Sequence, residues 1–429
     1  MRQKQKAIEM GLSFTVYAVL LLYPVTMFVY KGIRSEYFGV LVLAALTGLV
    51  IRSIRPSLAN VPVTHKWVLI SFVLISFIAW LSFAYFGFQE IARPRLVKFT
   101  WFILAVPLYY LFRHIRPRVE MIWMGLVVGS LVAGGRALLE EFQLVEEISW
   151  EGLGGRANGA MHPIRFGDLS LLLGFMSLAG ALYLQQIKLH IRILGLVAFS
   201  TGVIASILSL SRGGWLAVPL LLFVVLIPWW RHRGKLARLL VPGLMIALLV
   251  SIFLVPSMDV NKRLDQARND LVRYFEKGDS RSSLGARLDM FETAYHIFLK
   301  SPVFGVGIGS YHSHAQEYFE KKGGKLSREV VLWKNPHNEL LLQAATRGIP
   351  GILSFLVLFV SMGFAFTKAL GSTDASVLFH AVAGLSLVIG YAVFGMSIAL
   401  FEHRDFLLFF VIYGMLFLAG VNPGARQSI

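Results

Sequence analysis

The chain contains no cysteine among its 429 residues. Disulfide bonds and thiolate metal sites are therefore excluded, and the redox compartment cannot be inferred from cysteine usage. The sequence also has no Asp-x-Asp pair and no His-Glu-x-x-His motif, the second of which is typical of zinc peptidases. We therefore expect no metal site and no cofactor.

Charged residues are scarce as well, because they make up 15% of the chain, against about 25% in ordinary globular proteins. Apolar runs of about 20 residues, each long enough to cross the ~30 Å hydrocarbon core as a helix, recur from end to end. The runs lack the alternation of a transmembrane barrel strand. The sequence therefore predicts an all-α polytopic membrane protein.

We predict about twelve membrane helices, and the first of them reads as a membrane helix because no small-residue cleavage site follows it. The predicted spans are residues 10–30, 36–52, 67–88, 98–112, 119–142, 164–185, 193–210, 213–230, 237–255, 342–367, 376–397 and 405–421. This divides the chain into helices one to nine at 1–255, an extramembrane domain at 256–341 and helices ten to twelve at 342–429. Patches of helical spacing predict that the extramembrane domain is mostly helical. One patch runs from Ser282, a candidate cap, to Leu299 and places Leu288, Phe291, Ala294, Tyr295 and Phe298 on one face.

Lysine and arginine are unevenly distributed between the two sets of loops, and the net charge is +17. The loops on the side of the N-terminus hold more of them. Positive residues concentrate in cytoplasmic loops, so we expect both termini in the cytoplasm and the domain 256–341 on the opposite, outer face.

Five arginines fall at that outer face. Arginine in or near a membrane is costly and usually functional, and its forked donors suit phosphate oxygens. Arg212, flanked by Gly213 and Gly214, is the strongest candidate; for Arg156 and Arg165, anchoring to lipid headgroups is an equal alternative. The five candidate phosphate ligands are Arg136, Arg156, Arg165, Arg212 and Arg287.

His337 lies where the outer domain runs back into apolar chain. An imidazole can accept a proton near neutral pH, as a general base must. The alternative is a histidine that only tops a helix. Pro336 predicts the first turn of that helix, with Asn335 as its cap. We expect acceptor or sugar contacts from Asn335, Asn338, Glu339 and Tyr311.

Other polar groups favour structural roles. The acidic pairs Glu140-Glu141 and Glu146-Glu147 are more typical of a solvated helix end than of a cation site. His312 and His314 lack an obvious third ligand for a metal. The aromatic residues Trp150 and Trp333 suit either sugar stacking or membrane-interface anchoring.

Three motifs resemble the bacterial O-antigen ligase and polymerase superfamily over about residues 208–355. They are Leu208-Ser-Leu-Ser-Arg-Gly-Gly-Trp; Gly285-Ala-Arg-Leu-Asp-Met-Phe with Ser301-Pro-Val-Phe-Gly-Val-Gly; and Asn335-Pro-His-Asn-Glu-Leu-Leu with Gly348-Ile-Pro-Gly. The resemblance implies a C-type membrane glycosyltransferase of the bacterial inner membrane with a periplasmic active site. A ligase of this family moves O-polysaccharide from undecaprenyl diphosphate to a sugar of lipid A-core, with inversion and without metal.

By the same resemblance, Arg212 and Arg287 bind the diphosphate and His337 is the catalytic histidine. The chemistry is consistent with this, because arginines neutralise a diphosphate leaving group and a base must deprotonate the sugar hydroxyl. Two alternatives within the superfamily are a polysaccharide polymerase and a protein O-oligosaccharyltransferase. A transporter of lipid-linked sugars is less favoured, because transporters place ionisable residues near the bilayer midplane.

Overall fold

The computed structural model describes residues 2–32, 34–51, 54, 58–145, 155–231, 260–323 and 325–421. The predicted span 237–255, the pair Glu146-Glu147 and Trp150 lie outside these residues. The described part is helical and contains no strand. Its helices are α1 (Arg2–Val29), α2 (Arg34–Val50), α3 (Val63–Tyr85), α4 (Arg93–Ile115), α5 (Val119–Glu141), α6 (Pro163–Tyr183), α7 (Leu189–Leu208), α8 (Arg212–Trp215), α9 (Val218–Arg231), α11 (Val260–Lys277), α12 (Ser283–Lys300), α13 (Tyr311–Lys321), α14 (Glu329–Leu332), α15 (Glu339–Ala369), α16 (Ala375–Phe394) and α17 (Arg404–Gly420).

Nine helical stretches of the described chain are long and apolar enough to cross a membrane, which confirms a multi-pass membrane protein. The helices α2 and α17 occupy two more of the predicted spans, but each has 17 residues, slightly fewer than the ~20 of a typical span. The predicted span 213–230 consists of the short helix α8 followed by α9. The total of twelve stays a prediction.

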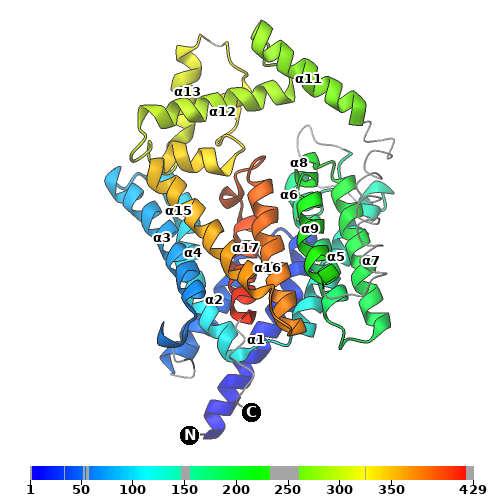
Figure 1. The fold of residues 1–429 in the computed structure, drawn as a ribbon. Coiled ribbons are helices and arrows are strands. Elements are labelled where there is room, and N and C mark those ends of the chain that lie inside the picture. The colour runs from blue at the N-terminus through cyan, green and yellow to red at the C-terminus, as the bar shows by residue number, and fades with distance from the viewer. Residues whose placement is uncertain are drawn as a thin grey trace.

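The bundle is built around α6, α16 and α17. The span of α6 is 94% buried and that of α16 is 83% buried, whereas α3 exposes large apolar side chains such as Phe77 and Trp80. Small residues allow this close packing of helices: a Cβ on Gly180 of α6 would lie 2.1 Å from the ring of Trp123. In Figure 1, α17 lies at the centre of the bundle behind α16.

The helices α11–α14 form a layer over one end of the bundle, and α1 begins at the other end (Figure 1). Ser282 caps α12, because its hydroxyl accepts a hydrogen bond from the Gly285 amide at 3.0 Å. The predicted apolar face of α12 is confirmed at Ala294 and wrong at Tyr295, which is 55% exposed; the buried face holds Met290, Ala294 and Ile297. This face packs against Tyr311 of α13 and Ala345 of α15 in a small separate core.

The glycine-rich loop 302–309 holds this layer on the bundle, because it docks on a kink in α15 at Gly348. The amides of Val306 and Gly307 donate to the carbonyls of Ala345 and Thr346, both at 3.0 Å. Gly305 has φ of +67°, and a Cβ there would lie 2.3 Å from the Thr346 carbonyl carbon. Two motifs that are separate in sequence, the loop 302–309 and residues 345–348 of α15, are thus in direct contact. We call this contact the joint.

Replacing Gly305 with alanine is therefore expected to loosen this joint. A left-handed backbone costs a non-glycine residue about 1–2 kcal/mol, and the collision with Thr346 adds to that cost. Gly278→Ala is a matched control, because Gly278 has φ of +62° with open space around it. Thermal unfolding of the purified variants should show the larger loss for Gly305→Ala, and equal losses would argue against the joint.

Candidate active site

His337 lies in a tight turn that directly precedes α15. Its φ is +50°, a left-handed conformation that is uncommon outside glycine and often marks a functional site. The His337 amide donates to the side-chain oxygen of Asn335 at 3.0 Å. The prediction that Asn335 caps the helix is wrong, because α15 begins at Glu339 and the side chain of Asn338 accepts from the Leu341 amide at 3.0 Å. Pro336 thus belongs to the turn and not to the helix.

The environment of His337 keeps its imidazole uncharged. Trp333 packs edge-on against the imidazole with 5.0 Å between ring centroids. Burial, and next the positive charge of Arg287, lower the pKa of His337 from 6.5 to about 4. The ring is therefore able to accept a proton at neutral pH.

Arg287 lies on α12 and faces the same space from the outer layer. Its guanidinium is half-buried and forms no hydrogen bond or ion pair with the residues that the structure describes. Burial lowers its pKa, and the nearby carboxylate of Glu329 partly restores it. An arginine that is desolvated without a direct carboxylate partner is well placed to hold an anion.

Arg212 begins α8 directly after a strained turn at Leu210, whose φ is +54°. Arg156 ties this turn to the neighbouring loop, because its Nε donates to the Ser209 carbonyl at 2.9 Å. Burial and the charge of Arg212 lower the pKa of Arg156, so the two guanidinium groups lie near each other. The Arg212 side chain is exposed at this surface.

The glycines beside Arg212 make room for other side chains of the protein. A Cβ on Gly213 would lie 2.7 Å from the Ser397 hydroxyl, and one on Gly214 would lie 2.2 Å from Asp168 Oδ1. The Ser211 hydroxyl donates to the same Asp168 oxygen at 2.9 Å. The glycine pair therefore lets α8 seat tightly against α6 and the end of α16, which fixes the base of Arg212.

His162, which was not predicted from the sequence, lies near Arg156, Arg165 and His337. It caps α6 by accepting from the Ile164 amide at 3.3 Å. Burial, and then the charges of Arg165, Arg156 and His337, lower its pKa to about 4. His162 thus links the arginines of the bundle to His337 of the outer domain. Its only sequence signal is its place before Pro163, at a helix start.

The other two predicted arginines are paired with buried carboxylates. Arg165 and Arg34 both bind Asp405, whose side chain is 1% exposed. Arg136 forms a 2.7 Å ion pair with Glu140, which also accepts the Asn158 amide at 2.8 Å. The interpretation of Glu140 as part of a solvated helix end is wrong, because this carboxylate holds the 158–159 loop against α5.

An outer cavity of about 580 Å³ adjoins this region. It is lined by basic side chains from four segments, and the acidic groups Glu402 and Asp405 partly balance their charge. His403 belongs to its wall, and its pKa is lowered by burial and by Arg165, Lys98, His162 and His337. This second unpredicted histidine places the cavity beside the His337 turn. The basic residues of the wall are Lys31, Arg34, Lys98, Arg165 and Arg404.

Residues 194–356 match a family model described as O-antigen ligase. That span contains Arg212, Arg287 and His337, which the structure brings to one end of the bundle. This part of the chain is similar to the O-antigen ligase superfamily.

Two relatives extend this result. The chain is 28% identical over 210 residues to an O-antigen ligase of Escherichia coli, and the alignment covers 48% of this chain and 47% of that protein. It is 24% identical over 325 residues to an uncharacterized protein of Haemophilus influenzae, covering 76% and 78% of the two chains. The match therefore spans less than half of the Escherichia coli ligase.

Two of the residues predicted to contact the substrate, Glu339 and Tyr311, are buried in the structure. Glu339 is 1% exposed; one carboxylate oxygen accepts the Phe401 amide at 3.0 Å and the other accepts the side chain of Gln343. Tyr311 is also 1% exposed, and its ring belongs to the small outer core. Trp333 is the exposed aromatic residue beside His337, with 44% of its surface accessible.

No cluster of three or more histidine, aspartate or glutamate side chains suited to a metal occurs in the described part of the chain. The site consists of His337 beside the guanidinium of Arg287, with Arg156 and Arg165 near His162. Such an arrangement is chemically suited to bind an anion and to accept a proton beside it.

Proposed function

We propose that this chain is an O-antigen ligase that transfers O-polysaccharide from undecaprenyl diphosphate to a sugar hydroxyl of lipid A-core. The observation that carries the proposal is the uncharged His337 next to Arg287, a guanidinium without an ion-pair partner among the described residues, inside the span that matches the ligase family. Similarity to the superfamily supports a lipid-linked donor and a glycolipid acceptor in general. We place the site on the periplasmic face of the bacterial inner membrane, with both termini in the cytoplasm.

His337 is the proposed general base. As the acceptor hydroxyl attacks the anomeric carbon, its proton passes to the imidazole and a new glycosidic bond forms. The bond between the anomeric carbon and the diphosphate oxygen breaks, and the lipid diphosphate leaves with its electron pair. Attack from the face opposite the leaving group inverts the anomeric centre. Trp333, which packs against the imidazole, is placed to stack on an acceptor sugar.

Arg287, Arg212 and Arg156 are the proposed diphosphate ligands. Charge develops on the leaving diphosphate, and fixed guanidinium groups stabilise it in a site from which water is partly excluded. Arg165 and Arg136 already bind carboxylates, so we assign them to the frame that supports the site. Asn335 and Asn338 hold the turn and the helix start.

The pH dependence of transfer tests the state of His337. In the free enzyme its pKa is about 4, so kcat/KM should stay level at neutral pH and fall with an acid midpoint near 4. The negative diphosphate offsets the charge of Arg287 and raises the pKa of His337, so the midpoint in kcat should lie higher. A midpoint near 6.5 in kcat/KM would contradict the buried, uncharged histidine.

Stability must be followed in the same pH series. Because the folded pKa of His337 lies below 6.5, protons favour the unfolded chain, and this contribution to stability is lost as the pH falls from about 6.5 through 4. Intrinsic fluorescence of the same samples separates unfolding from protonation of the base. A loss of rate that follows unfolding would not count as titration of His337.

A further inference from the structure

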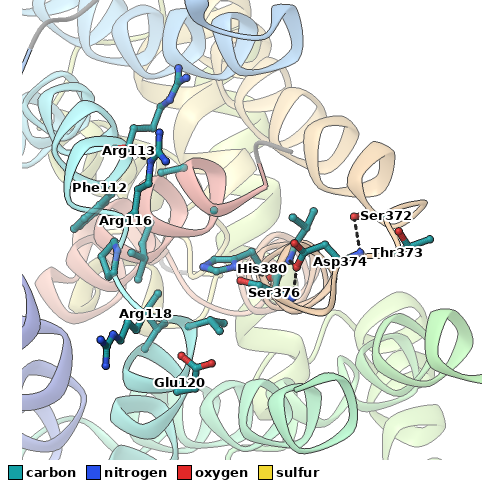
Figure 2. A pocket seen from close by; sticks show the side chains of 17 residues that line it. Phe112, Arg113, Arg116, Arg118, Glu120, Ser372, Thr373, Asp374, Ser376 and His380 are labelled. Atoms are coloured by element: carbon teal, nitrogen blue, oxygen red, sulfur yellow. Dashed lines mark hydrogen bonds between the residues drawn. The ribbon is translucent and has the colours of Figure 1, made fainter. Parts of the chain in front are cut away.

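A second cavity, of about 560 Å³, lies at the end of the bundle opposite His337. It is bounded by the turn between α4 and α5, by the start of α16 and by the end of α17 (Figure 2). The helix α5 runs from this cavity to Glu140, beside the 158–159 loop of the outer site. Its 23 residues separate the two places by about 35 Å at 1.5 Å per residue.

The turn between α4 and α5 makes the cavity positive. Arg113, Arg116 and Arg118 all line it. The two acidic residues of the wall are engaged elsewhere: Asp374 accepts from the amides at the start of α16, at 2.8 and 3.3 Å, and Glu120 accepts from the side chain of Gln186 at 3.3 Å. A cavity with this charge favours an anion.

Arg116 occupies a backbone position that would suit glycine better. It ends α4 with φ of +50° and ψ of +66°, and its amide donates to the Phe112 carbonyl at 2.9 Å. Glycine or asparagine usually fills such a left-handed helix end. Strained residues of this kind cluster at ligand sites, so the conformation adds to the case for Arg116, although Phe88 and Gln143 adopt it after α3 and α5 as well.

The rest of the wall combines apolar residues, among them Phe112, Ile122 and Leu416, with the hydroxyl side chains of Ser372, Thr373 and Ser376. His380 projects from α16 toward the turn (Figure 2). Its ring packs directly against Gly420 of α17, where an added Cβ would lie only 2.1 Å from the ring. Basic and hydroxyl groups beside apolar side chains, at the ends of membrane helices, suit a ligand with a phosphate and a hydrocarbon portion.

We propose that this cavity binds the phosphate headgroup of an anionic membrane lipid, with Arg116 and Arg118 as its ligands. The site is separate from the proposed active site and does not depend on the proposed ligase activity. The tendency of membrane proteins to concentrate lysine and arginine in the loops on one side of the membrane explains why basic residues gather at this end of the bundle. It does not explain the cavity.

The test uses the full-length protein in nanodiscs or neutral detergent, with phosphatidylglycerol as the probe and phosphatidylcholine as the uncharged comparison. Native mass spectrometry should show phosphatidylglycerol retained in preference to phosphatidylcholine. Arg116→Gly removes the charge and suits the left-handed backbone, so it should fold at least as well and bind phosphatidylglycerol about tenfold more weakly. Arg118→Gln should weaken binding in the same direction.

Lys188→Gln is the matched control, because Lys188 precedes α7 at the same end of the bundle but does not line the cavity. It should leave lipid binding unchanged. An equal loss in Lys188→Gln and Arg116→Gly would reduce the effect to general electrostatics and overturn the proposal. Displacement of the lipid by excess inorganic phosphate would assign the cavity to a soluble ion and overturn the lipid assignment.

Discussion

Replacement of His337 by asparagine is expected to slow glycan transfer by about 10²–10⁴-fold, the usual contribution of a general base. Asparagine is the appropriate substitution, because it tolerates the left-handed backbone of this position but cannot take the proton. Donor binding should be unchanged, since the arginines remain. Transfer is measured as ligated product from purified lipid-linked donor and acceptor, and donor binding is measured separately.

His296→Asn is the matched control for this variant. His296 lies on α12 and stacks on Tyr318 with 4.2 Å between ring centroids, on the outer layer but away from the His337 turn. It should retain normal transfer. If His337→Asn transferred glycan at a near-normal rate, the imidazole would only support the turn, and another group would have to take the proton.

Replacement of Arg287 by glutamine is expected to lower kcat by about 10²–10³-fold, comparable with the loss of one oxyanion-stabilising donor. The guanidinium loses no described hydrogen bond in this change, so the fold should be retained. The same variant removes the charge that helps to lower the pKa of His337. The acid midpoint of kcat/KM should therefore rise, which a purely structural role of Arg287 would not produce.

Arg281→Gln provides the control for charge in the same segment. Arg281 precedes α12, its side chain is 91% exposed and it pairs with Asp279, so its loss should change neither kcat nor the pH profile. The assignment of Arg287 fails if both variants behave alike. It also fails if Arg287→Gln loses activity only through a lower unfolding temperature.

Much of this fold was accessible from the sequence, because membrane spans and caps are local signals. Apolar runs predicted eleven of the helices that the structure describes at or near the predicted residues, and Ser282 was recognisable as a cap for α12. The glycine-rich motifs could be recognised in the sequence, but their structural role could not be predicted from it. Only the structure shows that Gly305 and Gly348 meet across the joint between the outer layer and α15.

The site was predicted less completely, because burial and long-range pairing leave little trace in one sequence. Asp405 holds Arg34 and Arg165 from helices far apart in the chain, so sequence reasoning treated Arg165 as a phosphate ligand. Glu339 resembles a site residue beside His337 and instead points into the bundle. His162 and His403 were missed, because only the folded chain brings them near His337.

A ligase and a polymerase of this superfamily would use the same base and the same phosphate ligands, so the acceptor decides between them. The most direct measurement is transfer by the purified protein in proteoliposomes that contain lipid-linked polysaccharide, with and without lipid A-core. The account predicts that polysaccharide moves onto lipid A-core in the wild-type protein and not in His337→Asn. Extension of the lipid-linked chain without lipid A-core, and no transfer when it is present, would contradict the ligase assignment.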